Sequence, residues 1–139
     1  MKQRLTKLKE LLCTIFSVLI IGTTVYAASN GATFVVNNVK IKASLSYIDT
    51  NDKNPIDTDS VTASTKANAA MDSIITTAKI YFADGDTLKT KTVKEYGTNC
   101  TKVTATAREN LLSVGYMGKG THYASHNKKS NSVNTVVYW

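Results

Sequence analysis

The chain has 139 residues and a formal net charge of +7, from 17 Lys and Arg against 10 Asp and Glu. The basic residues are spread along the chain without a block of five or more, so the charge is too weak to indicate a nucleic-acid partner. The sequence contains no phosphate-binding glycine loop, paired-cysteine motif or dinucleotide fingerprint, which excludes the enzyme classes that those motifs mark.

The first 27 residues are typical of a secretory signal peptide. The apolar run from Leu11 to Val25 follows four basic residues, and Val25-Tyr26-Ala27 ends in the small residue that cleavage requires. The run is about 15 residues long, against the roughly 20 that a membrane-spanning helix needs. We therefore predict cleavage after Ala27 and a secreted, extracellular protein.

Removal of residues 1–27 leaves 13 Lys and Arg against 9 Asp and Glu. The remaining chain has the length of one domain and folds without a covalent staple. Cys100 is then the only cysteine, so an internal disulfide is excluded, and its thiol is either buried or bridges two chains. We expect a flexible leader at residues 28–32, Ala-Ser-Asn-Gly-Ala, followed by one domain at residues 33–139.

Alternating apolar and polar residues predict antiparallel strands in most of this domain. From Val39 to Tyr47 the alternation is strict, and Asn37-Asn38 interrupts the pattern just before it, as a bulge or a tight turn would. Residues 64–78 fit both a helix and a strand. We expect two strands there, joined by a connection near residues 68–72.

The clearest turn signal is Asp84-Gly85, which lies between two alternating runs and predicts a type I′ hairpin. Further turns are expected at residues 96–99 and at Gly118-Lys119-Gly120. The alternation resumes from Val133 to the C-terminus. These elements predict an all-β fold, a single antiparallel β-sandwich of about seven strands.

The stretch from Asp49 to Asp59 is dense in turn-forming residues and holds the only proline, so it is expected to be a surface loop. Its acidic residues invite comparison with a calcium loop. The EF-hand pattern fails, because Lys53 occupies a ligand position and Ser60 stands where the bidentate Glu belongs. A plain loop and an irregular Ca²⁺ site both remain open.

Catalytic and metal sites are not predicted. His122 and His126 are four residues apart, and on a strand that spacing separates them by about 13 Å, too far to share an ion. Neither Cys100 nor Ser125 has a local nucleophile signature such as Gly-x-Ser-x-Gly. We therefore expect no enzyme activity and no cofactor.

Aromatic and basic residues gather in the last quarter of the chain, a mixture that suits a carbohydrate, a cell-wall polymer or a membrane surface. An alternative is that about half of these aromatic rings belong to the sandwich core. The candidate binding residues are Tyr116, Lys119, His122, Tyr123, His126, Lys128, Lys129, Tyr138 and Trp139.

The sequence therefore predicts a small secreted, non-enzymatic binding protein that acts at a cell envelope. In size, export signal, Thr-, Ser- and Asn-rich strands and aromatic terminus, the chain resembles the lactococcin type of β-sandwich bacteriocin. It lacks the Trp- and His-rich mature start expected of that type, and no motif matches residue by residue. The resemblance implies an alternative function, that of a secreted antimicrobial or toxin-like protein.

Overall fold

The computed structural model describes residues 21–24, 27–49 and 58–139, and side chains from residue 30 onward. These residues form seven strands: β1 (Ile21–Thr24), β2 (Ala27–Val36), β3 (Val39–Ile48), β4 (Ser60–Asp84), β5 (Thr87–Arg108), β6 (Val114–His126) and β7 (Lys129–Tyr138). Within the described ranges, no helix is long and apolar enough to cross a membrane. The all-β prediction is confirmed, and residues 64–78 lie in strand β4.

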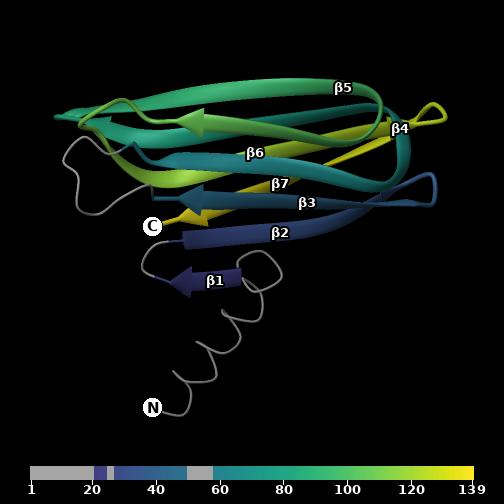
Figure 1. Ribbon diagram of the computed structural model, residues 1–139, viewed down its shortest axis with the longest axis horizontal. Coiled ribbons are helices and arrows are strands. Elements are labelled where there is room, and N and C mark those ends of the chain that lie inside the picture. The colour runs from purple at the N-terminus through teal and green to yellow at the C-terminus, as the bar shows by residue number, and fades with distance from the viewer. Residues whose placement is uncertain (1–20, 25–26, 50–57) are drawn as a thin grey trace, which may run out of the picture.

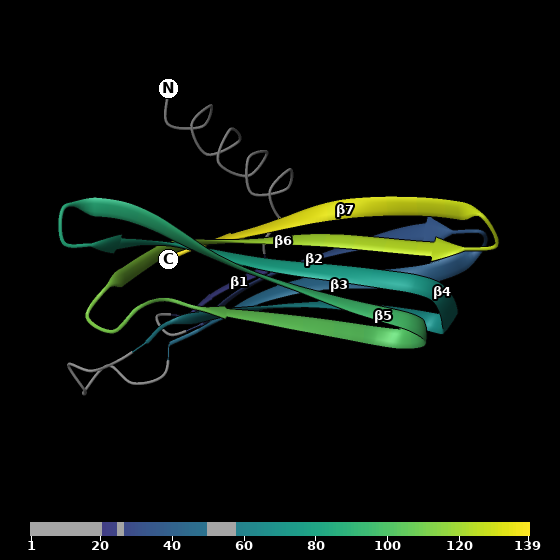
Figure 2. The same cartoon turned by 90° about the horizontal axis from the view of Figure 1, so that it is seen from above.

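All the strands belong to one antiparallel sheet, in which β4 and β5 are the longest members. Residues 60–66 of β4 pair with β3 and with residues 102–108 of β5. After a register shift between Lys66 and Met71, β4 pairs instead with the first part of β5 and with β6. Figures 1 and 2 show that β4 and β5 bend back together at one end of the molecule.

This bend folds the sheet into two facing layers. We call β2, β3 and the paired segments 60–66 of β4 and 102–108 of β5 the first half-sheet. The second half-sheet consists of the remaining segments of β4 and β5 together with β6 and β7. The interior between them is apolar, with the large buried side chains Ile41, Leu45, Val61, Met71, Ile74, Ile80 and Val137.

Beyond the short pairing of β2 with β1, strands β2 and β7 lie side by side, which makes the sheet nearly barrel-shaped. Side chains link these edges: Asn30 Nδ2 donates to the Val136 carbonyl at 2.7 Å, and Asn131 Nδ2 donates to the Val35 carbonyl at 3.4 Å. The predicted sandwich is therefore wrong in one respect, because its two layers belong to one continuous sheet and not to two separate sheets. The sheet is built from six strands of ten residues or more, β2 to β7, and β1 adds only a short segment. This is one long strand fewer than expected, because β4 and β5 continue through the expected turns.

The short hairpins follow local sequence rules. Asn37 and Asn38 both have positive φ, 47° and 68°, between the paired residues Val36 and Val39, as a two-residue type I′ turn requires. The β4–β5 hairpin is confirmed, but its turn residues are Gly85-Asp86. Of these two, only Gly85 has positive φ, which fits a type II′ turn instead of type I′.

The expected flexible leader at residues 28–32 differs from the structure. These residues lie in β2, and Asn30, Gly31 and Ala32 pair with Leu45, Ser44 and Ala43 of β3. Small side chains do not prevent this, because the main chain supplies the hydrogen bonds of the ladder. Residues 1–20, 25–26 and 50–57 lie outside the described residues. The expected cut after Ala27 falls inside β2, where Ala27 and Ala28 pair with Thr24 and Thr23 of β1. Signal cleavage therefore stays a prediction, and so does calcium binding in the 49–59 loop.

The turn expected at Gly118-Lys119-Gly120 is also absent, since all three residues lie within β6. Both glycines face the interior at points of close approach. A Cβ on Gly118 would lie 2.5 Å from Val61 Cγ1, and one on Gly120 would lie 2.4 Å from Thr135 Oγ1. The glycines therefore make room for packing inside the sheet, a use of glycine in strands that resembles a turn signal in the sequence.

Candidate functional site

The outer surface of the second half-sheet gathers tyrosine and lysine side chains from four strands. The register places Tyr81 of β4 beside Met117 of β6, and Met117 beside Tyr138 of β7. In a second row, Lys79 of β4 pairs with Lys119 of β6. In a third row, Ile75 of β4 lies between Tyr96 of β5 and Tyr123 of β6. We call this surface the tyrosine-lysine face, defined by Lys79, Tyr81, Lys94, Tyr96, Tyr116, Lys119, Tyr123 and Tyr138.

Alternation along each strand produces this face. Side chains at Ile74, Thr76, Ala78, Ile80 and Phe82 of β4 are buried, so the intervening residues point outward. In β6 the register shifts at Tyr81/Phe82, where Gly115 and Met117 oppose consecutive β4 residues and Tyr116 is the extra residue. The Tyr116 ring lies against that of Tyr81, with centroids 6.4 Å apart and a tilt of 53°.

The rings remain accessible while their neighbours hold them in place. Tyr96 is 66% exposed and Tyr138 is 57% exposed. Lys79 Nζ lies 4.8 Å from the centroid of the Tyr81 ring, and Lys94 Nζ lies 5.0 Å from that of Tyr96. These cation-π contacts orient the rings, while exposed aromatic surface is suited to stacking on a flat ligand.

The face is basic, with no acidic residue at the outward positions of the paired segments. In the described part of the chain, the nearest carboxylates on the strands, such as that of Glu95, lie at alternate positions whose side chains point to the other side of the sheet. Lys79 and Lys119 lie directly opposite each other on neighbouring strands. Like charges in that relationship repel, so an anionic ligand at this face would relieve the repulsion.

No protein-family model matches this chain, and the search of curated proteins finds no match.

Four of the nine predicted binding residues meet on this face, namely Tyr116, Lys119, Tyr123 and Tyr138. Sequence reasoning missed its other half, Lys79, Tyr81, Lys94 and Tyr96. The signal for these residues was present in the alternation around the Asp84-Gly85 hairpin, which orients residues 79, 81, 94 and 96 to one side. What the sequence did not provide was the pairing of β4 with β6.

His122 is not on the face, because it is fully buried between the two half-sheets. The Thr76 hydroxyl donates to Thr65 Oγ1 at 2.7 Å, and the Thr65 hydroxyl lies 2.8 Å from His122 Nδ1. With Thr65 donating to Nδ1, the proton of the neutral ring is on Nε2, which donates to Thr135 Oγ1 at 2.9 Å. Burial lowers the pKa of His122 to about 4, so the ring is a neutral structural bridge at pH 7.

Trp139 also belongs to the interior, as the alternative reading of the aromatic residues allows. Its ring stacks on Tyr47 with centroids 3.9 Å apart and an interplanar angle of 16°, and it packs against the buried cluster that contains Phe82 and Val137. Burial raises the pKa of Tyr47 far above its usual value, and a hydrogen bond with Asp59 raises it further. The pair anchors the C-terminus.

The remaining predicted residues lie at the far end of β6 and β7. His126 Nδ1 lies 3.5 Å from Asp72 Oδ1, and Lys128 and Lys129 are exposed at the turn that follows. This turn pairs His126 with Lys129 through Asn127 and Lys128, both with positive φ. These three predicted residues therefore form a separate, charged tip.

The described residues offer no evident catalytic constellation. Ser125 is hydrogen-bonded to Ser73 at 2.8 Å on the outer surface, whereas its neighbour His126 points to the opposite side. Across the described ranges, no group of three His, Cys, Asp or Glu side chains is placed to hold a metal ion. The chemistry that the tyrosine-lysine face can perform is binding, by ring stacking, hydroxyl hydrogen bonds and attraction of anions.

Proposed function

We propose that this protein is a secreted, non-enzymatic binding protein that attaches to an anionic polysaccharide of a cell envelope through the tyrosine-lysine face. One observation carries the proposal: five tyrosines and three lysines lie together on one outer surface whose paired positions contain no Asp or Glu. A sugar polymer offers flat apolar ring faces for stacking on tyrosine, and its acidic groups interact with lysine.

The shape of the face supports a polymer more than a small ligand. The tyrosine and lysine side chains spread across four strands, which spans about 14 Å between outer strands at the usual strand spacing. Such a surface makes many weak contacts to an extended ligand. The exposed rings of Tyr96 and Tyr138 are expected to contribute most, because tyrosine is prominent among residues that dominate binding energy.

The test is retention of the purified protein on isolated cell-wall material at low and high salt. We expect binding at low salt and partial release at high salt, because exposed charges are screened. The variant Tyr96→Ala/Tyr138→Ala should bind at least about tenfold more weakly. Lys79→Gln/Lys119→Gln should lose the salt-sensitive part of the retention.

A matched control replaces exposed apolar residues elsewhere, in Val35→Ala/Ile48→Ala. Val35 and Ile48 are 54% and 46% exposed and lie on the first half-sheet, so this variant should bind as the wild type does. Failure of the wild type to bind at either salt concentration would refute the proposal. So would equal loss of retention in the control and the tyrosine variant.

A further inference from the structure

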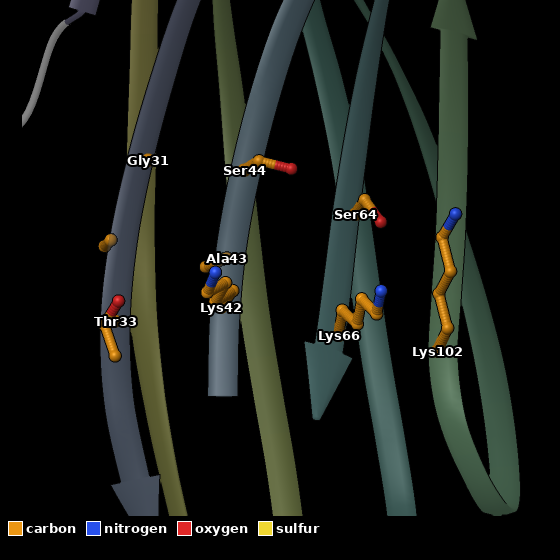
Figure 3. A pocket seen from close by; sticks show the side chains of 9 residues that line it. Gly31, Thr33, Lys42, Ala43, Ser44, Ser64, Lys66 and Lys102 are labelled. Atoms are coloured by element: carbon orange, nitrogen blue, oxygen red, sulfur yellow. The ribbon is translucent and has the colours of Figure 1, made fainter. Parts of the chain in front are cut away.

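The outer surface of the first half-sheet carries a row of three lysines that the tyrosine-lysine face does not include. The register pairs Lys42 of β3 with Lys66 of β4, and Lys66 with Lys102 of β5. Figure 3 shows these side chains on three neighbouring strands. Thr33 of β2 continues the row beyond Lys42.

The lysines line a shallow, open hollow of about 650 Å³. A second row of the sheet lies alongside, two positions away on each strand, and contains Ser44 and Ser64. At that level β2 contributes Gly31, whose lack of a side chain leaves the edge of the hollow open. The hollow therefore presents the ammonium groups of three lysines next to the hydroxyl groups of Ser44 and Ser64 (Figure 3).

This arrangement has an electrostatic cost when it is empty. Like charges directly opposite each other in a sheet repel, and Lys66 has a lysine on each side. In the described part of the chain, none of the three lysines forms a salt bridge, whereas Lys89 pairs with Asp84 at 2.7 Å. An anionic ligand with several charges would remove the repulsion at all three positions.

The geometry points to a linear phosphate polymer: we infer that Lys42, Lys66 and Lys102 bind successive phosphate groups of a chain that crosses the strands. Neighbouring strands are about 4.8 Å apart, so the row spans roughly 10 Å between its outer lysine positions. Lysine binds phosphate as a point charge, and hydroxyl groups donate to the remaining phosphate oxygens. A planar carboxylate would instead favour the forked geometry of arginine.

This site is independent of the proposed polysaccharide binding, because it lies on the other half-sheet. Ser44 and Ser64 supply the flanking hydroxyls, and Thr104 Oγ1 donates to Ser64 Oγ at 3.3 Å. On the side of the row away from the serines, Lys42 and Lys66 also line a second hollow together with Lys40 and Asn68. Lys40 lies two residues from Lys42 on the same strand, so the basic surface is wider than the row itself.

The test is titration of the purified protein with inorganic polyphosphate at several NaCl concentrations. We expect Lys42→Gln/Lys66→Gln/Lys102→Gln to weaken binding at least tenfold. The slope of log K against log salt should become shallower by roughly 2 to 3, since each neutralised phosphate contributes about 0.7 to 0.9. Polyphosphate should raise the melting temperature of the wild type more than that of this variant.

The matched control is Lys91→Gln/Lys128→Gln/Lys129→Gln, which removes the same charge from exposed positions elsewhere. It should bind polyphosphate within about twofold of the wild type, and equal weakening of both triple variants would overturn the site. Orthophosphate at the same phosphate concentration should bind far more weakly. Equal affinity for orthophosphate would overturn the polymer assignment, and preference for heparin would overturn the assignment to phosphate.

Discussion

The Nδ1 atom of His122 lies 2.8 Å from the hydroxyl oxygen of Thr65, and this contact joins the two half-sheets across the interior. Thr65 belongs to the part of β4 before the bend, while His122 lies in β6 opposite Thr76. Because all polar groups in this bridge are buried, loss of one partner leaves another without compensation. The buried bridge thereby favours one way of packing the half-sheets.

The free energy of unfolding should therefore decrease when the pH is lowered through a window set by the pKa of His122. Its pKa is about 4 in the folded protein and about 6.5 in an unfolded chain. Between these values the unfolded state binds more protons, so stability falls as pH is lowered from 6.5 towards 4, by roughly 3 kcal/mol in total. Urea unfolding at pH 7, 5.5 and 4.5 measures this change. His122→Gln should lose this contribution, and an unchanged pH profile would contradict the argument.

Gly120→Ala should destabilise the protein by about 1 to 3 kcal/mol, as overpacking a buried site does. The new Cβ would lie 2.4 Å from Thr135 Oγ1 and 2.7 Å from His122 Nε2, so the hydrogen bond between these groups would be displaced. Gly31→Ala is the control, because its Cβ would make an ordinary contact at 3.5 Å with the Ala43 carbonyl oxygen. Thermal unfolding of both variants should separate them, and equal melting temperatures would contradict the prediction.

Trp139→Ala should lower stability by about 3 to 5 kcal/mol, the usual cost of truncating a packed aromatic side chain. The ring stacks on Tyr47 and not on the tyrosine-lysine face, so at a temperature where the variant is folded, its retention on wall material should match the wild type. Urea unfolding followed by circular dichroism measures the loss. A variant with normal stability and weak binding would place Trp139 in the binding site.

The protein recovered from the medium of cells that express the full chain should begin at Ala28. Intact-mass measurement tests this directly, because cleavage removes residues 1–27. Ala27→Leu should block processing, since the peptidase requires a small residue before the cut. Recovery of the uncut chain in the medium would refute the predicted cleavage.

Local patterns were enough to predict much of the fold. The alternation from Val39 to Tyr47 predicts a strand with one buried face because side chains on a strand alternate between its two sides. The Asp84-Gly85 signal located the β4–β5 hairpin, although the turn itself is one residue further on, because only Gly85 adopts positive φ. The turns expected at residues 68–72 and 96–99 lie close to the bend. Strands β4 and β5 both continue through the bend, so the chain does not reverse there.

Local sequence patterns predict the all-β class, the strand from Val39, the β4–β5 hairpin and the presence of aromatic and basic side chains, because each depends on neighbours within a few positions. Which residues share a surface depends on the tertiary structure. Tyr81 meets Tyr116, and Lys42 aligns with Lys66 and Lys102, because the bend in β4 and β5 sets which distant strands pair. That pairing register depends on packing across the whole interior, including the His122 bridge, and is not encoded in any single stretch of the chain.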